Sequence, residues 1–343
     1  MPTSTAQPSG VLLVGSIPLT TTEEVLSKVC SALPGRLRSI PDGETSVRNN
    51  YIGWQLDCFP KKTRDSILGV TTAEVPPDHR GTFSLESVKP TQYDAAALES
   101  YKTFIKLRNK GAIPQGVMFQ VSLPSPLNSV KAHVKADFQP QLEPLYEHRI
   151  LESLATIIEG IPAEDLAIQW DICLEILVLE HERPDALSKA HFAPVLEGIV
   201  TRMQRLCKAV PSGIPLGLHL CYGDYRHKHF VEPQDLSLVV RLVNHITKAV
   251  DRPISWIHMP VPKDRDDSAY FEALSQLDVG DDVELYLGLV HANDTEGTRR
   301  RIRTAQSVVP RFGVATECGM GRTPTDELNS ILQISRDLTS PVV

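Results

Sequence analysis

The stretch "LGLHLCYGDYRHKHF" (residues 216–230) places a histidine and a cysteine at the end of an apolar run. His219 and Cys221 are two residues apart, and side chains at that spacing on a β-strand point to the same face. An imidazole and a thiolate on one face are a typical ligand pair for zinc. The alternative is a filled core, in which the thiol packs as a small apolar group.

The composition is that of a globular protein that acts on small molecules. The chain has 343 residues, 41% of them hydrophobic and 22% charged, which suits one large domain or two small ones. Its net charge of −7 argues against a nucleic-acid partner, which usually requires a basic face. No apolar run reaches the roughly 18 residues of a membrane span, so no membrane partner is expected. The oligomeric state does not follow from the composition.

The N-terminal segment and the cysteines indicate the compartment. Residues 1–10 lack the charged and apolar regions of a signal peptide and are predicted to form a flexible leader. The 6 cysteines are scattered, with no CxxC pair. Reduced thiols and a cytoplasmic location are therefore expected, and a special cysteine is better explained as a ligand or nucleophile than as half of a disulfide.

Short apolar runs alternate with amphipathic segments along the chain. Most of the runs are rich in Val, Ile, Leu and aromatic residues, as fully buried strands are. The runs cover residues 11–17, 37–44, 117–124, 166–172, 214–222, 254–261, 284–291 and 311–318. This alternation predicts an α/β fold, a (β/α)8 TIM barrel that forms a single domain over residues 11–343. A doubly wound open sheet is the alternative, weakened because no GxGxxG follows the first run.

Residues 45–116 interrupt the alternation. They are long, rich in proline and irregular, and end in the helix-like "AAALESYKTFIKLRNK". We predict an insertion after the second strand that lies over one mouth of the barrel as a lid. A solvent-exposed excursion without a role is the alternative, although long loops in compact domains often bind ligands.

Polar side chains gather where the predicted strands end. In a barrel of this type, the active site lies at the C-terminal ends of the strands. The side chains found there are Ser16, Glu44, Ser122, Asp171, His219, Cys221, His258, His291 and Cys318. Among them, His219, Cys221, His258 and Cys318 can converge as a tetrahedral set of zinc ligands.

Other residues near these strand ends carry possible roles. His291 is a candidate general acid or base, because imidazole titrates near neutral pH. Arg265 can bind a substrate carboxylate through two hydrogen bonds, with a surface salt bridge as the alternative. Arg322 can clamp an acidic substrate or close the barrel. Asp224, His227 and His229 can orient His219 or lie in a solvated loop.

Six motifs resemble those of cobalamin-independent methionine synthase, in that family's order. "HLCYGD" resembles its His-x-Cys zinc motif, and "ECGMGR" its second cysteine motif. "VGSIPL", "GETSVRNNY", "IQWDI" and "LYLGLVHAND" resemble its Gly-Ser turn, its Gly-Glu segment, its Gln-x-Asp strand and its penultimate strand. The motifs run from residue 11 to residue 322. The chain thus resembles a single-barrel, divergent member of the superfamily that also includes uroporphyrinogen decarboxylase.

The resemblance implies roles for two groups of residues. It places zinc ligation on His219, Cys221 and Cys318. It places recognition of the amino-acid end of homocysteine on Ser16, Glu44 and Asp171. The chemistry is sound, because two carboxylates suit an ammonium group and the free amides of a Gly-Ser turn suit a carboxylate.

The sequence also departs from that family. The glutamate that is the family's remaining zinc ligand is His258 here, which changes the formal charge of the site from about −1 to about 0. A less anionic site makes zinc a better Lewis acid and a coordinated thiolate a poorer nucleophile. The family implies a folate, but Trp54, Trp170 and Trp256 lie in no matching motif. Trp170 and Trp256 are expected to pack the barrel wall, so the sequence predicts zinc and no folate platform.

Three functions therefore remain open. The first is a zinc-dependent methyl- or alkyltransferase acting on a small thiol or amino-acid-like substrate, with His291, Asp171 and Glu44 as its catalytic groups. The second is a zinc-dependent lyase, decarboxylase or hydrolase acting on a small carboxylic acid, which His258 favours. The third is a non-catalytic binding relative.

Overall fold

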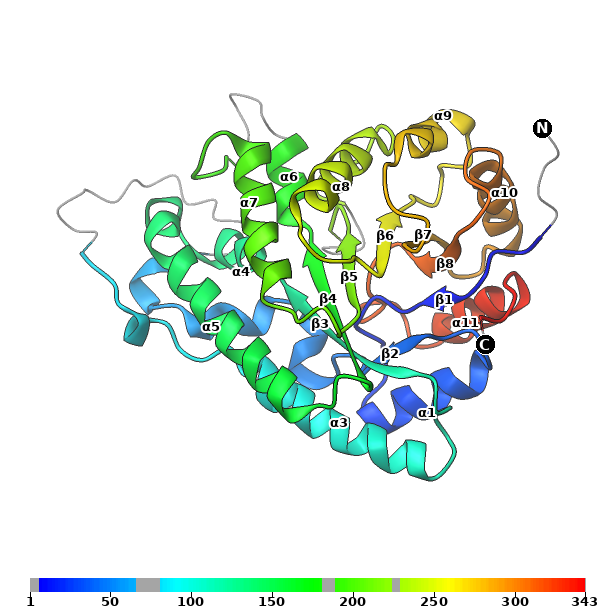
Figure 1. Cartoon of the computed structure of the whole chain (residues 1–343), viewed down its shortest axis with the longest axis horizontal. Helices are drawn as coiled ribbons and strands as arrows, with labels where there is room; N and C mark the ends of the chain where they lie inside the picture. Colours follow the sequence, from blue (N-terminus) through cyan, green and yellow to red (C-terminus); the bar gives the residue numbers. More distant parts are fainter. Residues whose placement is uncertain (1–5, 66–80, 181–188, 224–228, 343) are drawn as a thin grey trace.

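A computed structural model describes residues 6–65, 81–180, 189–223 and 229–342 (Figure 1). Its strands are β1 (Val11–Leu12), β2 (Ser39–Pro41), β3 (Met118–Pro124), β4 (Leu166–Ile172), β5 (Leu216–Leu220), β6 (Trp256–Pro260), β7 (Glu284–Val290) and β8 (Gly313–Thr316). Its α-helices are α1 (Thr22–Ala32), α3 (Tyr93–Asn109), α4 (Pro126–His133), α5 (Gln139–Gly160), α6 (Leu174–Glu180), α7 (Val195–Lys208), α8 (Ser237–Ala249), α9 (Ser268–Phe271), α10 (Thr295–Gln306) and α11 (Glu327–Asp337).

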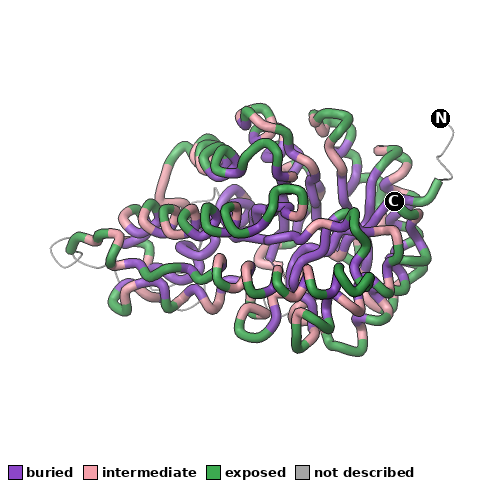
Figure 2. The backbone as a smooth tube through the Cα atoms, turned by 60° about the horizontal axis from the view of Figure 1, so that its bottom comes forward, coloured by how far each residue is buried: buried purple, intermediate pink, exposed green. Residues whose placement is uncertain are grey.

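The strands form one 8-stranded sheet of parallel pairs in the order β1-β8-β7-β6-β5-β4-β3-β2. Every pair except β1 with β8 joins strands that follow each other in the chain, and helices surround the sheet (Figure 1). The sheet is thus a nearly closed (β/α)8 barrel, as predicted. Figure 2 shows buried backbone at the centre and exposed backbone on the outer turns.

The barrel closes between β1 and β2 by backbone hydrogen bonds outside the short strands. Val11 N–H donates to the Arg36 carbonyl at 2.9 Å, and Ile17 N–H donates to the Gly43 carbonyl at 2.9 Å. Between these two bonds, side-chain amides replace the strand ladder. Gln120 Nε2 donates to the Leu13 carbonyl at 3.0 Å, and Gln169 Nε2 donates to the Val14 carbonyl at 2.7 Å. Two glutamines inside the barrel therefore fix the segment that follows β1.

The barrel interior places a large aromatic ring beside a residue without a side chain. Gly217 on β5 is the register partner of Trp256 on β6. A Cβ atom on Gly217 would lie 1.8 Å from the Trp256 indole, so glycine makes room for the ring. The indole Nε1–H donates to Gln169 Oε1 at 3.3 Å. Trp170 and Trp256 are both buried in the barrel, as predicted.

The outer helices follow from ordinary sequence signals. Helix α1 begins with a capping box, in which the Thr21 hydroxyl accepts from the Glu24 N–H and the Glu24 carboxylate accepts from the Thr21 N–H. Helices α7 and α8 pack against each other and bury their apolar sides, including Met203 and Val243. No helix among the described residues is long and apolar enough to cross a membrane.

The structure describes parts of two segments that the sequence analysis singled out, the insertion at 45–116 and the N-terminal leader. The described residues of 45–116 form short 3₁₀ helices and α3, which packs on α5. At the N-terminal end, the Pro8 carbonyl accepts from the Ser340 N–H at 2.9 Å, and Gly10 N–H donates to the Ser340 carbonyl at 3.1 Å. The last residues of the predicted leader therefore lie along the C-terminal segment, while residues 1–5 lie outside the described part of the chain.

Candidate metal and substrate site

A cavity of about 340 Å³ opens at the C-terminal ends of the strands, where the sequence predicted the site. Most of the predicted site residues line it: Ser16, Glu44, Asp171, His219, Cys221, Cys318 and Arg322. The remaining predicted residues, His258, His291 and Arg265, do not. Tyr51 and Ile52 from the 45–116 insertion also line the cavity, so this segment contributes to its wall.

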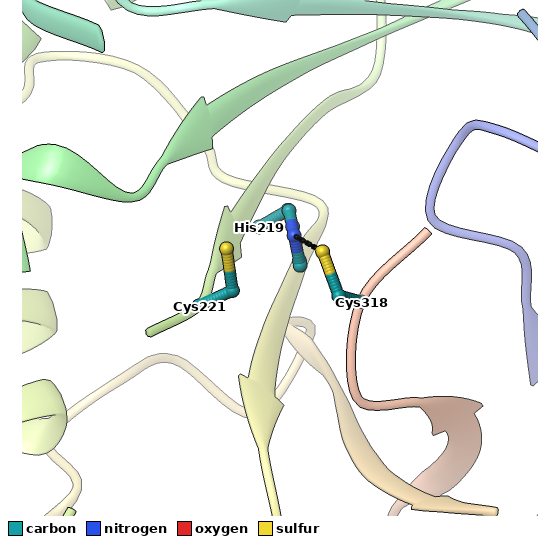
Figure 3. Close-up of side chains that lie close together, drawn as sticks. All are labelled: His219, Cys221 and Cys318. Atoms are coloured by element: carbon teal, nitrogen blue, oxygen red, sulfur yellow. Dashed lines mark hydrogen bonds between the residues drawn. The ribbon is translucent and has the colours of Figure 1, made fainter. Parts of the chain in front are cut away.

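Three side chains in the cavity wall have the spacing of metal ligands. One nitrogen of His219 and the Sγ atoms of Cys221 and Cys318 all lie within 4.8 Å of one another. His219 Nε2 lies 3.9 Å from Cys318 Sγ (Figure 3). His219 and Cys221 lie at the end of β5, and Cys318 follows β8, so parallel strands far apart in the sequence bring the three together.

His258, predicted as a fourth ligand, lies behind His219 and outside this group of three. Its Nε2 lies 3.0 Å from the Thr316 carbonyl, and its Nδ1 lies 2.7 Å from His219 Nδ1. Burial lowers the pKa of His258 to about 4, and burial together with His258 lowers the pKa of His219 well below its ordinary value. Both rings are therefore neutral at pH 7.

These contacts determine which nitrogen of His219 faces the cysteines. A carbonyl oxygen only accepts, so His258 Nε2 carries the hydrogen and donates to Thr316. The neutral His258 ring then has a bare Nδ1, which accepts from His219 Nδ1–H. The lone pair of His219 is left on Nε2, the atom nearest Cys318. His258 thus orients the His219 ring and selects its tautomer, as partners of metal-binding histidines commonly do.

Cys173 is a neighbour of this group that the sequence analysis did not single out. A side-chain hydrogen bond with Cys173 is the main cause that raises the pKa of Cys221 well above the ordinary thiol value, with burial adding to it and a hydrogen bond with Cys318 opposing it. Cys173 lines the same cavity. It follows Asp171 by two residues, as Cys221 follows His219, and the period-2 argument applied to β4 would have found it.

Two carboxylates face the same cavity from β2 and β4. Burial, with the Asp42 charge second, raises the pKa of Glu44 to about 7. Burial, with Glu44 second, raises the pKa of Asp171 well above its ordinary value. Gln169 Nε2 donates to Asp171 Oδ1 at 2.8 Å. The pair therefore resists carrying two negative charges unless a cation enters the cavity.

Glu44 is held by the loop after β2. Its φ is +48°, an uncommon left-handed conformation for a residue with a side chain. The Glu44 N–H donates to Asp42 Oδ1 at 2.8 Å, and Arg48 and Ser100 hold Asp42 Oδ2, each at 2.6 Å. Asp42 thus anchors the strained loop that presents Glu44 to the cavity.

The Gly-Ser turn after β1 is tied to the loop that carries Cys318 and Arg322. Met320 N–H donates to the Ser16 carbonyl at 2.7 Å, and Gly321 N–H donates to Ser16 Oγ at 3.1 Å. A Cβ atom on Gly319 would lie 2.4 Å from Ser16 Oγ. Glycine at position 319 therefore allows the close approach that joins the turn of β1 to the cysteine loop.

A second cavity, of about 640 Å³, adjoins the first. Gly223, Cys318 and Gly319 line both cavities, so the cysteine lies in the wall between them. His291 and Arg265, two predicted site residues, line this second cavity. The sequence prediction thus combined residues of two adjoining spaces into one site.

In the second cavity, His291 and Arg265 have different surroundings. His291 Nε2 lies 2.9 Å from the Val261 carbonyl and must donate to it, and burial lowers the pKa of the ring, so Nδ1 is the nitrogen available for proton transfer. Arg265 pairs with Asp267 at 2.8 Å and lies over the Tyr270 ring. These contacts favour the salt-bridge alternative for Arg265.

The loop after β5 is described only in part. His229 pairs with Glu232 and Glu317, each at 2.9 Å, and these carboxylates raise its pKa to about 9 against the opposing effect of burial. His229 lines the second cavity. Asp224 and His227 lie outside the described residues.

Comparison with known proteins shows likeness at the level of structure. No family model and no curated protein matches the chain. A B12-independent methionine synthase from Shewanella sp. W3-18-1, solved in complex with selenomethionine, shares 13% identity over 97% of this chain and 95% of its own, with a TM-score of 0.59.

Two further structures cover the chain in the same way. One, from Listeria monocytogenes, is assigned to the vitamin-B12 independent methionine synthases, with 14% identity over 98% of this chain and 99% of its own and a TM-score of 0.53. The other is a methyltransferase from Methanosarcina mazei, with 12% identity over 97% and 94% and a TM-score of 0.51. The resemblance seen in the sequence motifs is thus met at the level of the fold: the chain is a (β/α)8 barrel like those of B12-independent methionine synthases and a methyltransferase.

Proposed function

We propose that this protein is a divergent, zinc-dependent enzyme of the methionine-synthase-like type, which transfers a methyl or other alkyl group to the thiol of a small amino-acid-like substrate. One observation carries the proposal. Three side chains with the spacing of metal ligands and two carboxylates, Glu44 and Asp171, line the same cavity at the ends of the barrel strands. The fold shared with methyl-transfer enzymes supports it.

The three ligand residues fit zinc. A nitrogen and two sulfurs within 4.8 Å of one another suit tetrahedral coordination, and three protein ligands leave a fourth position for substrate, as catalytic zinc sites do. Paired thiolates favour zinc over harder divalent ions. When bound there, zinc lowers the pKa of a coordinated thiol. His258 supports this fit because it leaves the Nε2 lone pair of His219 free.

The carboxylates fit the amino-acid end of the substrate. Burial, with a neighbouring carboxylate second, raises both pKa values, and an ammonium group beside Glu44 and Asp171 would favour their charged forms. Ser16 and the backbone amides of its turn are the partners proposed for the substrate carboxylate, with Arg322, which also lines the cavity, beside them. A substrate held by both its ammonium group and its carboxylate is oriented with its side chain toward the three ligand residues.

The adjoining cavity supports a transfer reaction between two substrates rather than a reaction of a single substrate. Cys318 lies in the wall between the cavities, so a thiol in the first cavity and an alkyl donor in the second can meet beside it. His291 lines the second cavity, and its bare Nδ1 is the atom we propose to take up the proton that the thiol releases and then pass it to the departing group. The donor loses its alkyl group and gains a proton, and the thiol makes the reverse exchange.

The position of His258 weakens the lyase or hydrolase alternative. That alternative depended on His258 as a ligand, with a formal site charge of about 0. With His258 behind His219, the fourth position is left for a substrate thiolate, which would bring the formal charge to about −1. The formal charge of the site with the substrate thiolate bound then equals that of the ligand set in which a glutamate takes the place of His258.

Three broader proposals accompany this function. Residues 11–343 form a single catalytic domain, with 45–116 as a covering segment that contributes Tyr51 and Ile52 to the cavity. Arg265 supports the loop after β6 rather than the substrate, because Asp267 occupies its guanidinium. The cysteines are free thiols, the state proposed for a reducing, cytoplasmic compartment.

The first test is metal content, measured by elemental analysis on protein purified without added metal. The expected result is about one zinc per chain, lost in Cys221→Ser and Cys318→Ser and kept in Cys30→Ala, a buried cysteine of α1.

The second test is methylation of L-homocysteine by methyl iodide, a donor that needs no recognition by the protein. Zinc-dependent acceleration supports transfer. Bound zinc without acceleration favours the lyase or hydrolase alternative. Wild-type protein that takes up no metal would exclude both the zinc-dependent transferase and the zinc-dependent lyase or hydrolase.

A further inference from the structure

The thiols of Cys173 and Cys221 lie side by side at the ends of neighbouring strands. In the parallel ladder of β4 and β5, Asp171 is the partner of His219 and Ile172 is the partner of Leu220. Cys173 and Cys221 are the next residues on the two chains. Both residues belong to one small buried cluster with Ile52 and Leu174, and the Cys173 thiol is the main cause that raises the pKa of Cys221.

The β4–β5 pairing places the backbones of the two cysteines about one strand spacing apart. Cys221 N–H donates to the Ile172 carbonyl at 3.2 Å, and the Cys173 carbonyl accepts from Leu177 N–H at 3.2 Å. Neighbouring strands lie about 4.8 Å apart. Disulfides usually join Cα atoms about 4.4–6.8 Å apart. Joining the thiols therefore requires side-chain rotation with little movement of the backbone.

The two thiols are also within reach of a small oxidant. Only 5% of Cys173 and 4% of Cys221 is exposed, but both line the cavity of about 340 Å³. Cys318 Sγ also lies within 4.8 Å of Cys221 Sγ, but it follows β8, which β6 and β7 separate from β5, and it faces His219 Nε2. Cys173 is not one of the three clustered ligand residues, so its thiol is not required for the metal.

We propose that Cys173 and Cys221 form a redox-sensitive pair whose oxidation to a disulfide removes Cys221 from the metal site. With hydrogen peroxide as the oxidant, one thiol is converted to a sulfenic acid and one water leaves. The second thiol then attacks that sulfur, the S–S bond forms, and the hydroxyl leaves as a second water. Two thiols lose two electrons in total, and one peroxide gains them.

Oxidation and metal binding then exclude each other, because Cys221 cannot serve both. Zinc protects the pair by holding Cys221, and the disulfide lowers metal affinity by taking one of three ligands away. This link to zinc rests on the proposed function, whereas the disulfide itself rests on the described geometry alone. Cys173 is therefore not a catalytic residue but the partner that makes the metal site respond to oxidants.

The test treats the full-length protein with hydrogen peroxide, before and after zinc removal by a chelator, and maps disulfides by mass spectrometry of unreduced peptides. In the zinc-free protein, we expect a Cys173–Cys221 disulfide and a loss of two thiols per chain, with Cys30, Cys58 and Cys207 still reduced. One equivalent of zinc should slow the reaction at least tenfold. In the zinc-loaded protein, a chromogenic chelator should record zinc release together with the disulfide.

Variants separate this proposal from the proposed function. Cys173→Ser should lose the disulfide and keep its zinc, whereas Cys318→Ser should lose zinc and keep the disulfide. A Cys221–Cys318 disulfide in its place, or peroxide treatment that leaves Cys173 reduced in the zinc-free wild type, would overturn the proposal. These two results need no variant and no activity, so failure of the redox pair is distinguishable from failure of the transferase proposal.

Discussion

Nδ1 of His219 lies 2.7 Å from Nδ1 of His258, and the two residues are register partners on β5 and β6. Because the Thr316 carbonyl fixes the hydrogen on His258 Nε2, this contact makes His219 donate from Nδ1 and offer Nε2 to a metal. His258, which the sequence analysis placed among the candidate ligands, thus lies behind His219, another of those candidates.

Removing the acceptor behind His219 should weaken metal binding. In His258→Phe, no atom accepts from His219 Nδ1–H, so the ring loses the contact that selects its tautomer. We expect zinc affinity to fall about 10- to 100-fold. Competition with a chromogenic chelator measures it. His258→Gln, whose side-chain oxygen can accept, should retain more of the affinity. Equal zinc affinity in wild type and the Phe variant would show that the contact does not matter.

Filling the space at Gly217 should destabilise the barrel. The added methyl group of Gly217→Ala would meet the Trp256 indole, and overpacking of this kind costs about 1–3 kcal/mol. Chemical denaturation of the metal-free protein measures the change in unfolding free energy. Gly213→Ala is the matched control, because nothing lies within 4 Å of its added atom. The expectation fails if both alanine variants are equally stable.

The Gly319 contact should couple the β1 turn to the metal ligands. In Gly319→Ala, the new methyl group meets Ser16 Oγ and pushes the loop that carries Cys318. We expect weaker zinc binding in a protein that still folds, as judged by circular dichroism. The double variant Ser16→Gly, Gly319→Ala removes the obstructing side chain and should regain affinity. Lack of any recovery would indicate that the loop is displaced for another reason.

The carboxyl group of Glu44 should make stability depend on pH. Its pKa rises from 4.5 to about 7 on folding, mainly through burial. Between these values, the folded protein keeps a proton that the unfolded chain has released, so stability falls as the pH rises. Glu44→Gln should flatten this fall in denaturation experiments between about pH 4.5 and 7.

Glu175 supplies the matched control for that titration. Burial also raises its pKa to about 7, yet it lies outside the residues that line the cavity. Glu175→Gln should flatten the pH dependence of stability in a similar way. Only Glu44→Gln should weaken binding of an amino-acid ligand such as L-homocysteine. If Glu175→Gln weakens that binding equally, Glu44 has no special role in recognition.

The barrel could be predicted because its buried strands are continuous apolar runs. The run at 166–172 coincides with β4, and the other runs contain their strands with one to a few residues to spare. The first run was predicted over 11–17, whereas β1 is Val11–Leu12. The difference arises because glutamine side chains, and not a neighbouring strand, bond the Leu13 and Val14 carbonyls. A single-sequence pattern does not contain such contacts.

The candidate site could be predicted in outline for the same reason. Parallel strands bring their C-terminal ends to one rim, so strand-end residues such as Asp171 and His219 meet there. The pattern could not show that His258 uses both ring nitrogens for other contacts, since these depend on Thr316 and the barrel closure. It also could not separate two adjoining cavities, because both open on the same rim.

The place of Cys318 in the wall between the two cavities has a kinetic consequence. Two reactants that occupy separate spaces on either side of one residue do not compete for room, so both can be present when the group moves. Initial rates measured against both concentrations should then give intersecting double-reciprocal lines, the mark of a ternary complex, and not the parallel lines of a ping-pong exchange. The alkyl group would be transferred directly from donor to thiol in a single displacement, with one inversion of configuration at its carbon.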